Sequence, residues 1–144
     1  MLNKDMQQTI DLIVNNLMEQ FEIYASPVPI EDMLHQPPKG FWHEVDVTQL
    51  SGSFLSIRHR YSPRMSIARM LARHIISSDW GKTQGLMDIL QQTDSEFINI
   101  LARALIMPES MVNRLSSNSR NPSVISMQFE VPEDDAQQRL LELE

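Results

Sequence analysis

The chain has 144 residues, 42% of them hydrophobic, which is enough for one domain with a substantial core. It has no cysteine, which excludes disulfides, thiolate metal sites and cysteine nucleophiles. Its formal net charge of −7 disfavours nonspecific binding to nucleic acid. Residues 1–21 carry acids within an amphipathic pattern, unlike a signal peptide or a membrane span. We therefore expect a cytoplasmic protein that does not bind a membrane.

Apolar residues spaced three and four apart predict a helix within residues 1–25. They are Met6, Ile10, Ile13, Val14, Leu17, Met18 and Phe21. Pro27 and Pro29 end this helix, because the residue before a proline avoids the helical conformation. Pro29 also fits the first turn of a short helix over residues 30–35, and the two prolines of residues 36–40 predict a loop after it.

We expect the middle of the chain, residues 29–115, to form the core of the fold. Two short stretches, residues 45–47 and 52–57, predict strands with a glycine turn between them. Pro63 is placed to open the next helix, which has an apolar face as far as about residue 78. Further helical patterns follow over residues 83–92, from about residue 95 to the break at Pro108, and from there to Leu115.

The end of the chain predicts a loop and a final helix. Residues 116–123 are rich in Ser and Asn, which is typical of a surface loop. The pattern of residues 124–129 fits a helix or an extended segment. The acids after Pro132 predict a helix start within the C-terminal segment, residues 124–144, because acids complement the helix dipole. Together the elements predict one α+β domain over residues 1–144, mostly helical with a small sheet.

The charges are unevenly placed, because the stretch from Arg58 to His74 is basic and holds no acid. Arg69 and Arg73 lie four residues apart, so they fall on one face of the predicted helix. One interpretation is a cleft that binds a phosphate or a partner's carboxylate. The other, which we favour, is that the two arginines pair with acids of the chain such as Glu96 or point to solvent.

Three segments resemble motifs of the ImmA/IrrE metallopeptidase family, in the same order and with matching spacing. Residues 64–73, RMSIARMLAR, resemble the segment that starts the family's active-site helix. Residues 99–109, NILARALIMPE, are similar to the helix that supplies its third metal ligand. Residues 129–143 begin with FEVP and resemble its closing segment. The resemblance implies a fold like that of the minimal zincins, a small α+β domain.

The family, where intact, binds zinc through two histidines of an HExxH motif, whose glutamate activates water. At the matching positions this chain has Arg69, Met70 and Arg73. Arginine stays protonated and offers no lone pair to a metal, and methionine is no general base. The resemblance thus implies a protein that is not an enzyme and has no metal or cofactor. The third-ligand position falls near Glu96, where an Arg–carboxylate cluster would replace the metal.

The former metal site then becomes a candidate binding cleft. Its residues are Arg69, Met70, Arg73 and Glu96, with Arg58, Arg60 and His74 at its edge. By the resemblance, an inactive member of the family would bind a protein, such as a transcriptional regulator, without cleaving it. Such a protein would belong to a bacterium or a phage, in a stress response or a mobile element.

Two alternatives from other classes stay open. A metal-dependent peptidase with a relocated site would draw its ligands from His43, His59, His74 and Glu96, although no two histidines have the spacing of a helical ligand pair. A nucleic-acid-binding accessory domain would use the basic stretch, in which Tyr61 is the only aromatic residue available for stacking.

Overall fold

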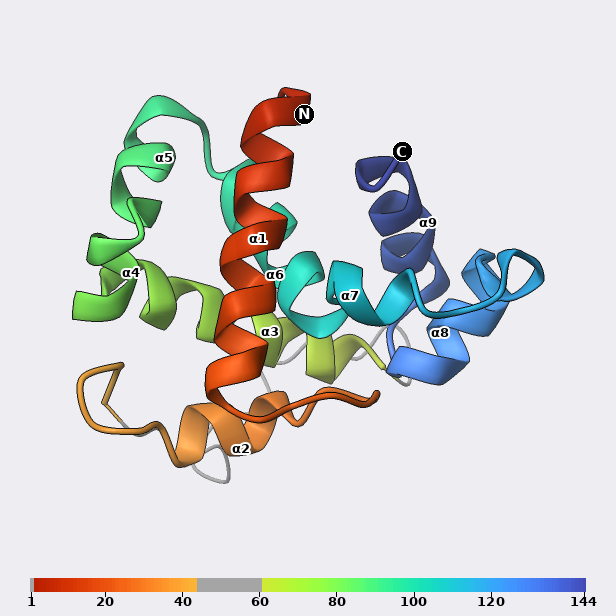
Figure 1. The fold of residues 1–144 in the computed structure, drawn as a ribbon, viewed down its shortest axis with the longest axis horizontal. Helices are drawn as coiled ribbons and strands as arrows, with labels where there is room; N and C mark the ends of the chain where they lie inside the picture. Colours follow the sequence, from red (N-terminus) through yellow and green to blue (C-terminus); the bar gives the residue numbers. More distant parts are fainter. Residues whose placement is uncertain (1, 44–60) are drawn as a thin grey trace.

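Helices follow one another along the described part of the chain, residues 2–43 and 61–144 of this computed structural model (Figure 1). They are α1 (Lys4–Gln20), α2 (Ile30–His35), α3 (Ser62–Ser77), α4 (Asp79–Thr83), α5 (Leu86–Gln92), α6 (Glu96–Ile106), α7 (Glu109–Val112), α8 (Pro122–Phe129) and α9 (Glu133–Glu142). A short 3-10 helix, η2 (Ser117–Ser119), lies in the connection between α7 and α8.

The predicted α+β architecture is wrong, because residues 2–43 and 61–144 form helices and their connections and contain no strand. The stretches predicted as strands, residues 45–47 and 52–57, lie outside the described residues. Amphipathic helices can bury their apolar faces against one another, so this core forms without a sheet. The zincin-like fold that the family resemblance implied contains such a sheet, so this prediction is wrong as well.

Several predicted helices are present with shifted ends. α1 ends at Gln20, before the predicted limit of residue 25. Residues 83–92 do not form one helix, because Gly85 adopts a left-handed conformation (φ 82°) between α4 and α5. Residues 124–129, for which the sequence left two conformations open, belong to α8. The Asn121 side chain caps α8 by accepting a hydrogen bond from the Val124 N–H at 3.0 Å.

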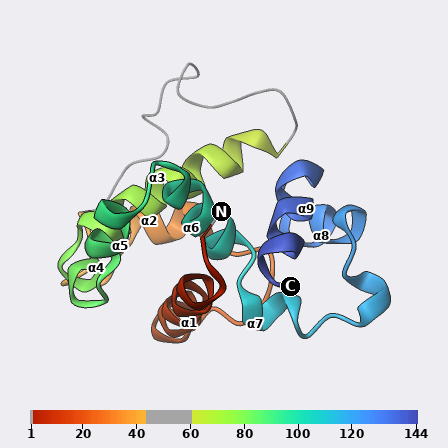
Figure 2. The same ribbon diagram turned by 90° about the horizontal axis from the view of Figure 1, so that it is seen from above.

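Helix α6 lies at the centre of the fold, between α1 and α3 (Figure 2). Its longest contact is with α3, where Leu71 and Ala72 are fully buried, as are Ala104 and Leu105 of α6. Small alanine side chains on both helices let the two backbones approach closely. Helices α8 and α9 pack on each other, and α9 joins this pair to α6. This packing determines which face of α3 is buried, and the opposite face does not contact α6.

A single serine organises the junction of α3 and α4. The Ser78 hydroxyl donates a hydrogen bond to the Ile75 carbonyl at 2.6 Å and accepts one from the Gly81 N–H at 2.9 Å. The turn is so tight that a Cβ atom on Gly81 would lie 1.8 Å from the Ile75 oxygen. Only glycine therefore fits at this position, where α4 folds back against the end of α3.

Replacement of Gly81 by alanine should destabilise the domain by about 1–3 kcal/mol, because the added methyl group forces the two helices apart. The free energy of unfolding, measured by urea denaturation, checks this. Lys82→Ala is the matched control in the same helix, since Lys82 is exposed, and it should change the stability by no more than about 0.5 kcal/mol. Equal stabilities for the two variants would contradict the close approach.

Helix α1 ends in a Schellman motif built on a glutamate. The Ile23 N–H donates to the Met18 carbonyl at 2.9 Å, and the Glu22 N–H donates to the Glu19 carbonyl at 3.0 Å. The motif requires a left-handed residue, and Glu22 takes this conformation with φ 56°. A side chain with a Cβ is strained there, whereas glycine is not.

The variant Glu22→Gly should therefore raise the free energy of unfolding by about 1 kcal/mol, because it removes this backbone strain. Glu19→Gly is the informative control, since it places glycine inside α1 and should lower the stability by about the same amount. Thermal denaturation of both variants shows whether each substitution raises or lowers the stability. A loss of stability in Glu22→Gly would show that the left-handed turn is not strained.

Candidate functional site

The exposed side of α3 carries the residues that the sequence proposed for a binding cleft. Arg73 is exposed, whereas Arg69, Met70 and His74 are partly buried. Helix α3 contains no Asp or Glu from end to end, so its surface is basic in an acidic chain. Arg58 and Arg60, predicted at the edge of the cleft, lie outside the described residues.

The first arginine of α3 has a structural role. The Arg64 side chain is largely buried and donates hydrogen bonds to the Glu31 carboxylate at 3.2 Å and to the Val28 carbonyl at 3.0 Å. It also donates to the Glu130 carbonyl at 3.2 Å, just after α8. Arg64 thus ties the start of α3 to α2 and to the end of α8, and its charge is satisfied within the fold.

The charge of Arg69 acts on an acid that the sequence did not suggest. Its Nη2 donates to the Ser66 hydroxyl at 3.1 Å, and its charge acts on Asp135 in the first turn of α9. Burial raises the pKa of Asp135 above its usual range, and the positive charges of Arg103 and Arg69 offset only part of this effect. The charge of Arg69 is therefore partly balanced from α9.

Glu96 does not meet Arg69 or Arg73 in the described contacts. Its carboxylate lies 3.4 Å from Nη2 of Arg103, on the same helix, and accepts a hydrogen bond from the Asn99 amide at 3.3 Å. The side chain is half exposed, at 50%. An Arg–carboxylate cluster does exist next to α3, but its central arginine is Arg103.

Arg103 forms a buried ion pair with Glu142 of α9. Its Nη2 lies 2.6 Å from Glu142 Oε2, and its Nε donates to the same carboxylate at 3.1 Å. The two side chains are only 8% and 1% exposed. Burial lowers the pKa of Arg103, but hydrogen bonds and charge from Glu142 and Glu96 outweigh it and raise the pKa above its usual value. Sequence reasoning missed this pair, although a charged residue between Ala102 and Ala104 was a visible signal.

A second buried arginine joins the two ends of the chain. Arg139 of α9 is fully buried, and its Nη2 lies 2.8 Å from Oδ1 of Asp11 on α1. Its Nε donates to the Met107 carbonyl at 2.9 Å, at the end of α6. Asp11 is itself 3% exposed, so the pair is removed from solvent on both sides. These contacts fix α9 in the position in which the charge of Arg69 on α3 acts on Asp135.

Replacing Arg139 by methionine should lower the free energy of unfolding by about 3–5 kcal/mol, because it leaves the Asp11 carboxylate buried without its oppositely charged partner. The double variant Arg139→Met, Asp11→Leu should recover a large part of that loss, since it removes both charges. Urea denaturation of the wild type, the two single variants and the double variant gives the coupling energy. Simple additivity of the two single effects would contradict a direct pair.

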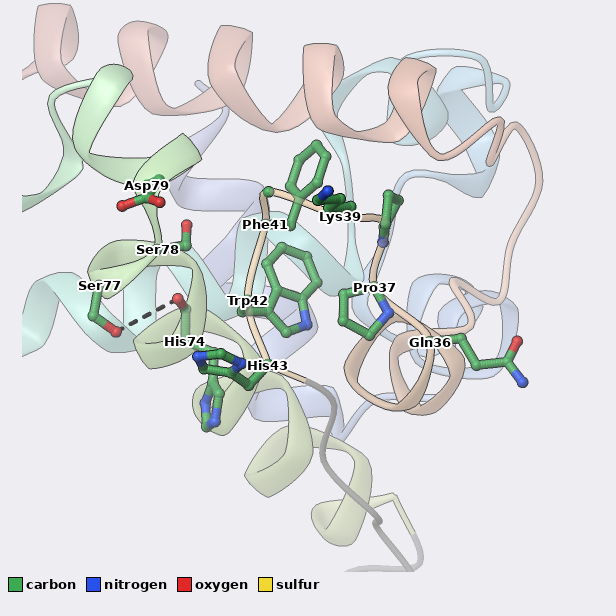
Figure 3. A pocket seen from close by; sticks show the side chains of 12 residues that line it. Gln36, Pro37, Lys39, Phe41, Trp42, His43, His74, Ser77, Ser78 and Asp79 are labelled. Carbon is green, nitrogen blue, oxygen red and sulfur yellow. Dashed lines mark hydrogen bonds between the residues drawn. The ribbon is translucent and has the colours of Figure 1, made fainter.

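A cavity of about 650 Å³ opens beside the C-terminal end of α3 (Figure 3). Residues 36–43 form one wall, and His74, Ser77, Ser78 and Asp79 form the other. The loop wall is anchored by Trp42, whose indole N–H donates to the Met33 carbonyl at 3.1 Å. The indole also stacks on Phe21, with ring centroids 5.6 Å apart and planes at 8°. Phe41 packs edge-on against both rings.

The residues considered for a relocated metal site are divided by the fold. His43 and His74 border the same cavity, whereas Glu96 pairs with Arg103. His59 lies outside the described residues. Within residues 2–43 and 61–144, no group of three or more histidines and carboxylates is placed to share a metal ion. A three-ligand site like that of a zinc peptidase is thus not assembled from this part of the chain.

No family model, curated protein or solved structure matches this chain. Among the helices that the structure describes, none has both the length and the apolar character needed to cross a bilayer.

Proposed function

We propose that this chain acts by binding an acidic segment of a protein partner along the exposed face of α3. The observation that carries the proposal is Arg73, which is exposed and whose guanidinium has no hydrogen bond or ion pair within the described residues. The other two arginines of α3 differ from it, because Arg64 is satisfied within the fold and Arg69 is partly balanced by Asp135.

The charge pattern supports an acidic partner. A guanidinium binds a carboxylate through two parallel hydrogen bonds, which favours Asp and Glu side chains over neutral groups. Arg69 lies one turn before Arg73 on the same face, so the pair can meet two acids of an extended or helical segment. The chain as a whole carries −7, so a basic face of this kind would direct an acidic partner to one side of the domain.

The same residues support binding without catalysis. The positions that resemble the HExxH motif hold Arg69, Met70 and Arg73, none of which can bind zinc or activate water. A link to the ImmA/IrrE family stays a prediction, and it suggests a transcriptional regulator as the class of partner. In this proposal the partner binds the exposed face of α3, whereas the sequence predicted binding in a zincin-like cleft.

Charge reversal at Arg73 tests the proposal. The wild type, Arg73→Glu and Lys82→Glu would each be used to capture partners from the native host, with quantitative mass spectrometry of the proteins retained. Lys82 is exposed on α4, so its variant changes the net charge equally without touching α3. A partner retained by the wild type and by Lys82→Glu should be lost from Arg73→Glu. With the purified partner, the affinity should fall at least about tenfold.

Three results would contradict the proposal. Equal capture by the wild type and Arg73→Glu would move the interface away from α3. Capture of nucleic acid, with binding that falls steeply as salt is raised, would favour the nucleic-acid alternative. Capture of no partner under native conditions would remove the protein-binding function.

A further inference from the structure

Two histidines from different elements border the cavity at the end of α3. His43 comes from the loop after α2, and His74 comes from the last turn of α3 (Figure 3). We propose that these two imidazoles form a binding site for a divalent transition-metal ion of the class that prefers nitrogen ligands, such as Zn²⁺. The site adjoins the proposed partner-binding face of α3 but uses neither Arg69 nor Arg73, so the variants that test the two proposals are different and each proposal can fail by itself.

The hydrogen bonding of His74 prepares it for this role. Its Nδ1 lies 2.9 Å from the Met70 carbonyl oxygen, which can only accept. The neutral ring must therefore carry its proton on Nδ1, so the lone pair is on Nε2. Metal-binding histidines commonly have this arrangement, in which a backbone carbonyl fixes the tautomer and the orientation of the ring.

The position of His43 is set by its neighbour. Trp42 is 8% exposed and is held by the Met33 carbonyl and by stacking on Phe21. The backbone that leads to His43 is thereby anchored, and Figure 3 shows its imidazole reaching back toward α3, where His74 lies. Because His43 is exposed and has no hydrogen bond within the described residues, its ring nitrogens are available to a ligand.

Neither imidazole is needed by the core. His43 is exposed, His74 is partly exposed, and both face a cavity open to solvent. The cavity lining carries one negative side chain, Asp79, and one positive side chain, Lys39, so their charges offset each other. With no third ligand among the described residues, water or a ligand from solution would complete the coordination of the ion. The site would thus bind an ion that keeps exchangeable positions.

Zinc titration of the purified full-length chain tests the site. Isothermal titration calorimetry with ZnCl₂ should give one ion per chain. In NMR spectra, the ring signals of His43 and His74 should shift together, and those of His35 should not. His43→Gln and His74→Gln should each weaken binding at least tenfold. His35→Gln should leave it unchanged, since His35 is exposed at the end of α2 and does not line the cavity.

The glutamine variants keep the size of the side chain, and unchanged melting temperatures would show that they remain folded. The proposal is overturned if the wild type shows no saturable zinc binding up to millimolar concentration. It is also overturned if either glutamine variant binds zinc as the wild type does, or if His35→Gln weakens binding equally.

Discussion

The position of the last helix depends on one buried guanidinium. Arg139 reaches Asp11 of α1 at 2.8 Å and the carbonyl of Met107 at 2.9 Å, with no exposure to solvent. A charge so placed must be paired, because an unpaired one would cost several kcal/mol. The pair thus ties the position of α9 to those of α1 and α6. Such a pair contributes less to net stability than to the choice of a single arrangement, which is the role we assign to it here.

The electrostatics of α3 follow from that position of α9. Once α9 is fixed, Glu142 meets Arg103, and Asp135 comes within the field of Arg69. One end of the α3 surface is thus balanced from within the domain. Arg73 receives no such partner in the described residues and stays available. The acidic chain consequently presents a local basic surface on a rigid helix, and a rigid surface loses less entropy when a partner binds.

The sequence could predict features that depend on neighbouring residues, but not those that depend on contacts between distant parts of the chain. Helical spacing of apolar residues predicted α1 and α3, because the period of a helix is a local property of the chain. Short β-branched stretches predicted strands, but strands depend on partners that the sequence does not identify, and the sheet was wrong. The basic face of α3 was visible from composition alone, whereas the partners of Arg69 and Glu96 were not. The charge of Asp135 acts on Arg69 from α9, and Arg103, the partner of Glu96, is itself paired with Glu142 of α9, so both environments depend on the long-range packing of that helix.

The pairing of Asp11 with Arg139 joins residues that are 128 positions apart in the chain. A ribosome makes α1 before α9, so the Asp11 carboxylate lacks its native ion-pair partner until α9 has been made. Contacts of this separation form late, because closing a long loop costs entropy before any contact repays it. The earlier helices can collapse during translation, and α1 contacts α6 directly, but the ion pair of Asp11 awaits the arrival of α9. Completion of the fold is thereby coupled to completion of this segment of the chain.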